Sequence, residues 1–200
     1  MPAGNYADVL YGRKVLHSAS KVIEGCVGNI GWQASLEVAK YLGKDALYTM
    51  VDVDAHDLSV HKRMFLQNYR ANLVLGTPRF EWIEGRIENQ QKIISQRDIL
   101  LFHNYMPVDA ETFEGRQDGS LERMADLFAK LIYARPEYIV FFLPYRKNSD
   151  FVSQMLSDPQ WIQCENVDNV HFAGDLGDAK PEEWMGRVII AHDKHHKPQN

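Results

Sequence analysis

Short apolar runs alternate with segments of helical periodicity along most of this chain of 200 residues. The runs 98–102 and 138–143 are almost continuously apolar, which is typical of central strands that are covered on both faces. Between two other runs, Leu36, Ala39 and Leu42 recur on a single helical face. Strands and helices that alternate in this way form a parallel sheet with helices on both faces. The pattern therefore predicts an α/β protein with a three-layer sandwich architecture.

The sheet is expected to be twisted, mostly parallel and seven-stranded. The predicted strands are 21–24, 47–53, 80–83, 98–102, 138–143, 161–167 and 187–191. No helical pattern separates the last two strands, because Gly174, Gly177 and Pro181 interrupt the chain there. These two strands are therefore predicted to form an antiparallel pair at the C-terminal end of the sheet.

Two of the intervening segments show extended helical periodicity. A helix is expected over about 57–72, with Val60, Met64 and Ala71 on one stripe. A second helix is expected over 121–132, where the apolar stripe is the most regular in the chain. The tryptophans expected in the core are Trp82, Trp161 and Trp184.

Charge and cysteine content limit the class of protein. A formal net charge of −5 disfavours a broad surface for bulk nucleic acid or for an anionic membrane. Cys26 and Cys164 are too few for a disulfide framework and are typical of a reducing cytosol. The first residues contain no apolar signal core, and the longest apolar run, 138–144, is too short to span a bilayer. We therefore predict a cytoplasmic protein that binds neither membranes nor bulk nucleic acid.

A glycine-rich turn follows the first predicted strand. Gly25, Gly28 and Gly31 recur at a spacing of three residues, just before a predicted helix. Glycines allow a tight turn and a close approach of the backbone to a ligand, and a helix N-terminus favours a carboxylate or phosphate. The alternative is a plain strand-to-helix turn that happens to be rich in glycine.

An acid at the end of the second strand favours the ligand interpretation. Asp52 lies 21 residues beyond Gly31, where a carboxylate accepts hydrogen bonds from the two ribose hydroxyls of an adenosine. The alternative for Asp52 is a cap for the next helix, a role that Asp54 or Asp57 could also fill. We expect Asp52 to be exposed and to contribute little to folding.

With these residues, the sequence resembles the class I S-adenosylmethionine-dependent methyltransferases over about 21–191. Glu24 inside the loop, Asp52, and the final pair of strands carry the resemblance. It implies one Rossmann-like methyltransferase domain over 1–192, with a lead-in segment at 1–20 and a flexible His-rich tail at 193–200.

The resemblance also implies a set of cofactor-binding residues. Glu24 and the loop would hold the methionine end of S-adenosylmethionine, and Asp52, with Val53 beside it, would hold the ribose. The loop after the third strand would lie beside the adenine. The full set is Glu24, Gly25, Gly28, Gly31, Asp52, Val53, Gly85, Arg86 and Ile87.

The loop departs from the family pattern in one respect. The usual spacing is acid-x-Gly-x-Gly, whereas here glycines fall one and four residues after Glu24. We therefore expect a loop that is one residue longer than usual or differently turned.

The fourth strand ends where such a fold places the transferred methyl group. His103 could act as the general base, and Asn104 or Tyr105 could orient the acceptor. The catalytic candidates are thus His103 and Tyr105, and the alternative for His103 is a histidine with a purely structural role. No metal is expected, because the acids that would bind one near this point are absent and the terminal histidines fit a tail better than a metal site.

Three functions remain open from the sequence. The leading one is methyl transfer from S-adenosylmethionine to a small-molecule or protein acceptor. The second is an NAD-type oxidoreductase, because the glycines and Asp52 also fit that fold loosely. The third is a methyltransferase-like subunit that binds a partner without catalysis.

Overall fold

A computed structural model of the chain describes residues 4–28, 31–90, 98–103, 133–144, 162–171 and 185–194, together with residues 94, 126, 129–130, 152 and 156. The strands are β1 (Gly4–Asn5), β2 (Lys21–Gly25), β3 (Leu47–Asp52), β4 (Arg79–Glu84), β5 (Asp98–His103), β6 (Tyr138–Pro144), β7 (Ile162–His171) and β8 (Met185–Asp193). The helices are α1 (Tyr6–Gly12), α2 (Trp32–Ala39) and α3 (Ala55–Asn68), with a short 3₁₀ turn, η1 (Ile87–Asn89).

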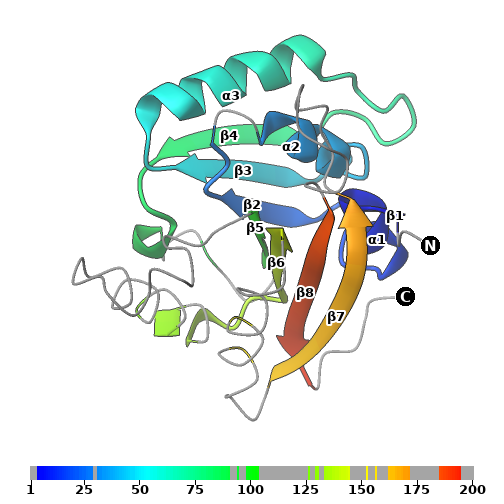
Figure 1. The fold of residues 1–200 in the computed structure, drawn as a ribbon. Coiled ribbons are helices and arrows are strands. Elements are labelled where there is room, and N and C mark those ends of the chain that lie inside the picture. Colours follow the sequence, from blue (N-terminus) through cyan, green and yellow to red (C-terminus); the bar gives the residue numbers. More distant parts are fainter. Residues whose placement is uncertain are drawn as a thin grey trace.

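All eight strands belong to one sheet, with the order β1-β7-β8-β6-β5-β2-β3-β4 (Figure 1). Strands β2 to β6 are parallel, and β8 runs antiparallel to both β6 and β7. The seven expected strands and the antiparallel C-terminal pair are therefore confirmed. The additional two-residue strand β1 comes from the N-terminal lead-in segment and pairs with β7, Gly4 opposite Val170.

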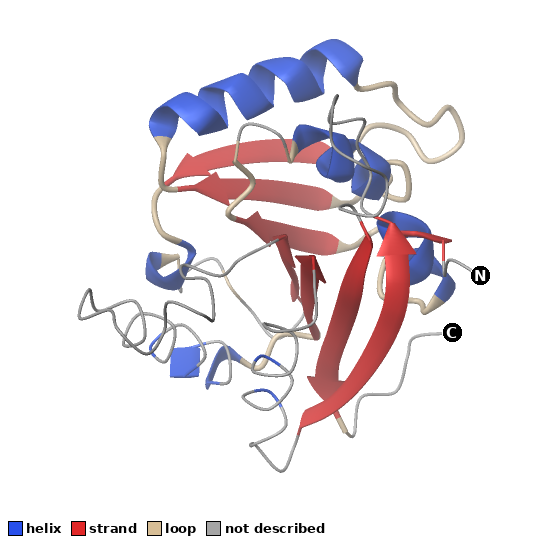
Figure 2. Ribbon diagram, in the orientation of Figure 1, coloured by secondary structure: helices blue, strands red, loops and turns tan. Residues whose placement is uncertain are grey.

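Both faces of the sheet are covered, as the alternating pattern requires. Helices α1, α2 and α3 pack on the face that carries Val22, Tyr48 and Leu101 (Figure 2). On the other face the core also includes Val152 and Leu156, which are both helical. Every residue from 99 to 102 of β5 is buried, which confirms β5 as a central strand. The three-layer α/β architecture is thus confirmed.

Helix α3 differs from its prediction in both extent and buried face. It ends at Asn68, and its buried residues are Leu58, His61 and Phe65 rather than the expected stripe Val60, Met64 and Ala71. The prediction was wrong because it counted apolar residues only. A histidine with hydrogen-bond partners inside the protein can occupy a core position. The helix expected over 121–132 lies largely outside the described residues.

The lead-in segment forms α1, which packs against the sheet. Tyr6 is buried and its ring lies edge-on to that of Phe142, with 5.8 Å between the centroids. Side chains of Ala7, Val9 and Leu10 fill the same core. Among the described residues, no helix combines the length and apolar character needed to cross a membrane.

Candidate functional site

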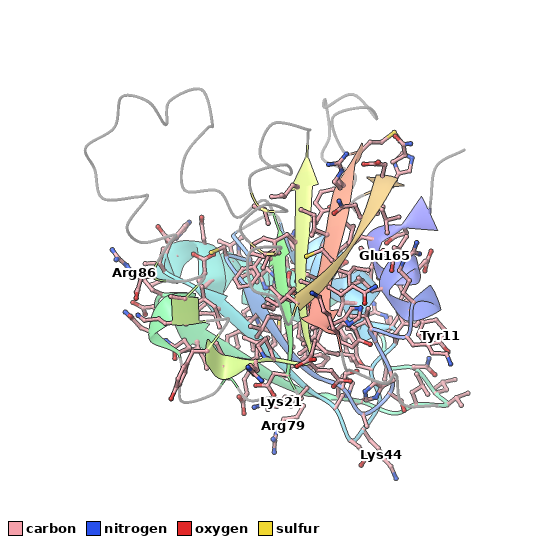
Figure 3. The ribbon with its side chains drawn as sticks, turned by 90° about the horizontal axis from the view of Figure 1, so that it is seen from below. Tyr11, Lys21, Lys44, Arg79, Arg86 and Glu165 are labelled. Atoms are coloured by element: carbon pink, nitrogen blue, oxygen red, sulfur yellow. The ribbon has the colours of Figure 1, made fainter. Side chains whose placement is uncertain are left out.

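The parallel strands β2, β3, β4 and β5 end together, and their carboxyl ends form one edge of the sheet. Gly25 pairs with Val51 on one side and Phe102 on the other, and Asp52 pairs with Glu84. In the sheet, β2 has β3 on one side and β5 on the other, so the strands that follow β2 in the sequence are placed first on one side of it and then on the other. Open α/β sheets bind ligands at such a switch point. In Figure 3, Lys21 and Arg79 mark the opposite, amino edge, far from Arg86.

The turn after β2 contains two residues in the left-handed conformation. Cys26 has φ of 59° and Gly28 has φ of 56°, and they lie two and four residues after Glu24. This is the spacing acid-x-Gly-x-Gly, with cysteine in place of the first glycine. The expectation of a loop that is longer or differently turned rested on glycine identity, whereas the left-handed backbone that glycine usually supplies occurs here at Cys26 and Gly28.

The three glycines of the turn face different surroundings. A Cβ on Gly31 would lie 2.1 Å from the Val27 carbonyl oxygen, and one on Gly25 would lie 3.1 Å from the Phe102 ring. A Cβ on Gly28 would meet no atom of the described residues within 4 Å. Gly31 is thus required by the packing of the turn itself, whereas Gly28 combines a positive φ with open space beside it.

Asp52, at the end of β3, is hydrogen-bonded to this turn. One carboxylate oxygen accepts the N–H of Gly28 at 2.8 Å, and the other accepts the N–H of Asp54 at 2.9 Å. Asp52 is only 8% exposed, so the expectation of an exposed acid was wrong. The helix-capping role belongs to Asp54, whose side chain accepts the N–H groups of His56 and Asp57. Of the alternatives that the sequence left open, the structure thus gives the helix cap to Asp54 and not to Asp52.

Glu24 points to the helical face of the sheet rather than outward from its edge. The residue is 0% exposed, and one carboxylate oxygen accepts the hydroxyl of Ser35 at 2.8 Å and that of Tyr48. The Ser35 oxygen also lies 3.0 Å from Nε2 of His61, whose Nδ1 lies 3.3 Å from the indole nitrogen of Trp82. Although a serine, a histidine and an acid meet here, the acid contacts the serine and not the histidine. The group therefore lacks the geometry of a nucleophilic triad.

Sequence reasoning did not find this polar cluster, and it interpreted Trp82 as an ordinary core residue. The available signal was the position of His61, which shares a helical stripe with Leu58 and Phe65. A histidine on a buried stripe needs partners, but only the fold shows that these come from β4 and α2.

The segment after β4 closes back on the glycine turn. Gly85 has φ of 144° and donates its N–H to the Asp52 carbonyl oxygen at 2.8 Å. Ile87 is buried, with a side-chain carbon 3.3 Å from the position of a Cβ on Gly25. Arg86 is exposed, and so is Val53 next to Asp52. The structure thus brings the proposed adenine segment and the proposed ribose acid to one place.

The two catalytic candidates are only partly described. The backbone of His103 ends β5 and pairs with Phe142, one residue beyond the pairing of Phe102 with Gly25. This places the position of His103 at the carboxyl edge, beside the glycine turn. Asn104 and Tyr105 lie outside the described residues. Within the described residues, no group of three or more His, Cys, Asp or Glu side chains could hold a metal ion.

Two buried tyrosines lie close to the Glu24 charge. Burial raises the pKa of Tyr48 well above its usual value of 10.0, and the charge and hydrogen bond of Glu24 raise it further. Burial, and then the Glu24 charge, raise the pKa of Tyr6 in the same direction. Both hydroxyls therefore stay protonated in the folded protein at pH values where they ionise in the unfolded chain.

This difference predicts a loss of stability at alkaline pH. Above pH about 10 the unfolded state loses these protons first, so the free energy of unfolding falls by about 1.4 kcal/mol per pH unit for each such tyrosine. In Tyr48→Phe the free energy of unfolding should fall less steeply with pH, because one of the two tyrosine contributions is gone. The same variant should be less stable at neutral pH, because Glu24 loses a hydrogen-bond donor. Urea unfolding between pH 8 and 11 measures both effects. Tyr133→Phe, at a 92% exposed position, is the control, and an unchanged slope in Tyr48→Phe would contradict the prediction.

Comparison with known proteins supports the same fold. No protein-family model and no curated protein matches the sequence. Among solved structures, the chain resembles an S-adenosylmethionine-dependent O-methyltransferase from Thermotoga maritima, with a TM-score of 0.62 and 10% identity over 96% of this chain and 66% of that one. A candidate rRNA methylase from Clostridium thermocellum has a TM-score of 0.58 and 15% identity, over 94% of both chains. Precorrin-6y C5,15-methyltransferase from Geobacter metallireducens has a TM-score of 0.57 and 11% identity, over 94% of this chain and 87% of that one.

Sheet order, the antiparallel β8 and these similarities together define the fold. The chain has the class I Rossmann-like fold of S-adenosylmethionine-dependent methyltransferases. The resemblance found in the sequence is thereby confirmed at the level of the fold.

Proposed function

We propose that this protein is a methyltransferase that binds S-adenosylmethionine at the carboxyl edge of β2, β3 and β4. The observation that carries the proposal is the pairing of Asp52 with Gly28: a buried carboxylate holds a left-handed glycine that has open space beside it. In this fold, that is where the adenosine part of the cofactor would lie.

The residues at this edge fit the cofactor. Each oxygen of Asp52 accepts one backbone N–H and has a second lone pair with which to accept a ribose hydroxyl. Val53 is 63% exposed next to Asp52 and offers an apolar surface to the adenine, with Gly85, Arg86 and Ile87 on the neighbouring segment. We assign Glu24, Gly25 and Gly31 to the shape of the loop and Gly28 to direct approach to the cofactor.

S-adenosylmethionine, when bound, supplies a methyl group activated by its sulfonium. The protein then has to align the acceptor in line with this methyl group and, for a hydroxyl or protonated amine, to remove a proton. We assign proton removal to His103 and acceptor orientation to Tyr105. A small-molecule or protein acceptor is favoured by the net charge of −5, although the similar structures include a candidate rRNA methylase.

Thermal unfolding with S-adenosylhomocysteine, with NAD and with neither tests the proposal. A ligand at 100 times its Kd adds about 2.7 kcal/mol to the stability of the folded state. We expect this shift with S-adenosylhomocysteine alone. A shift with NAD instead would indicate an oxidoreductase, and no shift with either would favour a subunit that binds a partner without this cofactor.

Gly28→Val is the matched variant for this experiment. Its side chain would project into the open space, and a β-branched residue at positive φ costs about 1–2 kcal/mol of backbone strain. We expect a folded protein whose unfolding temperature no longer responds to S-adenosylhomocysteine. A normal response would mean that the loop is an ordinary turn.

A further inference from the structure

Five side chains from five different elements form one continuous chain of hydrogen bonds beneath the glycine turn. The members are Trp82 on β4, His61 on α3, Ser35 on α2, Glu24 on β2 and Tyr48 on β3. We propose that Ser35 and His61 are positioning residues for the glycine turn. The hydrogen-bond chain of these five side chains holds the start of α2 against β4 and α3, and the start of α2 is also the end of the turn.

The chain of hydrogen bonds has a single direction. An indole N–H can only donate, so Nδ1 of His61 accepts from Trp82. His61 is therefore neutral with its proton on Nε2, and this proton is donated to the Ser35 oxygen 3.0 Å away. The Ser35 hydroxyl then donates to Glu24 at 2.8 Å. Trp82 thus selects the tautomer of His61, which in turn orients Ser35 toward the carboxylate.

Ser35 also connects these side-chain hydrogen bonds to the glycine turn. Its backbone N–H donates to the Gly31 carbonyl oxygen at 3.1 Å, and its hydroxyl oxygen lies 3.2 Å from the same atom. Gly31 in turn donates its N–H to the Val27 carbonyl oxygen at 3.1 Å. The turn is therefore bonded to Asp52 through the N–H of Gly28 and to the backbone N–H of Ser35 through the carbonyl oxygen of Gly31, in addition to the backbone bonds of Cys26 and Val27 to Val51.

Burial makes the arrangement sensitive to each partner. Glu24, Ser35 and His61 are all 0% exposed. A buried carboxylate is stable only while hydrogen-bond donors surround it, so the loss of Ser35 forces a local rearrangement. Because the first turn of α2 and the glycine turn share Gly31, that rearrangement reaches the turn.

Amide hydrogen exchange of the ligand-free full chain tests the role directly. We expect the N–H groups of Gly28 and Gly31 to exchange about tenfold faster, or more, in Ser35→Ala and in His61→Phe. His61→Phe keeps a ring of similar shape but offers neither the acceptor nor the donor. His61→Gln, which restores a donor toward Ser35, should bring the exchange rates back toward those of the unmodified protein.

Ser20→Ala is the matched control. Ser20 is 2% exposed and its hydroxyl accepts the N–H of His17, but it lies before β2, at the amino edge of the sheet. It should leave both loop amides within about twofold of their original rates. Equal acceleration in Ser20→Ala, or unchanged rates in both Ser35→Ala and His61→Phe, would overturn the proposal. If His61→Phe does not fold, the exchange rates are measured in Trp82→Phe, which removes the donor to Nδ1 of His61.

A second readout rests on the proposed function. The same two variants should raise the Kd of S-adenosylhomocysteine about tenfold, and Ser20→Ala should not. If the unmodified protein fails to bind this compound, the proposed function is wrong. The exchange rates of the ligand-free protein still decide whether Ser35 and His61 position the turn.

Discussion

Asp52→Ala is expected to weaken S-adenosylhomocysteine binding by about 3 kcal/mol, or about 150-fold, the upper end of the range for hydrogen bonds to a charged group. The variant loses the proposed bonds to both ribose hydroxyls. It also releases the N–H of Gly28, so the glycine turn loses one of its hydrogen bonds to β3. Titration calorimetry measures the affinity, and we expect stability to fall as well, because Asp52 is buried and accepts two backbone N–H groups.

Two further variants make the result specific. Asp54→Ala removes the same charge two residues away and should cost about 1 kcal/mol of stability through the lost helix cap, with affinity unchanged. Asp52→Asn should be almost as damaging as Asp52→Ala, because its NH₂ group would face the N–H of Gly28 or of Asp54. Unchanged affinity in Asp52→Ala would remove Asp52 from the cofactor site.

His103→Ala is expected to reduce the rate of methyl transfer by about 10²–10⁴-fold, the usual contribution of a general base. The motive is the register of β5, which places His103 at the carboxyl edge one residue beyond the pairing of Phe102 with Gly25. A histidine, with an unperturbed pKa of about 6.5, can accept a proton from the methyl acceptor at neutral pH. The affinity for S-adenosylhomocysteine should remain within about threefold.

The measurement is a single-turnover rate at saturating cofactor, with an acceptor identified by screening for release of S-adenosylhomocysteine. Reduced cofactor affinity with an intact rate of the bound complex would assign His103 to binding or packing. A rate within a few-fold of the unmodified protein would exclude His103 as the base and would favour a domain that binds without catalysis.

The layered fold followed from the sequence because local patterns carry it. Apolar runs of strand length, with helical periodicity between most of them, indicate a parallel sheet whatever the details of packing. The absence of such periodicity before β8 indicated the antiparallel pair. The buried stripe of α3 was not predictable in the same way, because His61 became a core residue only through partners on other elements.

The glycine turn lies directly after β2, as the sequence predicted, but its conformation could not be predicted. Its position after β2 follows from residue spacing alone. Its conformation depends on which residues adopt positive φ, and Cys26 does so while its N–H donates to the Val51 carbonyl oxygen in the adjacent strand. Sequence identity at a single position could not reveal it.

The sequence by itself thus determined seven strands with an antiparallel C-terminal pair, the glycine-rich turn after β2 and the two acids near it. The tertiary structure alone decided what those acids do. It showed that Asp52 holds the Gly28 N–H, and that Glu24 lies under α2 with Ser35 and Tyr48. The physical reason is that hydrogen bonds join atoms that are close in space. Glu24, Ser35 and Tyr48 come from three different elements, and only the packing of α2 and β3 against β2 brings them within bonding distance.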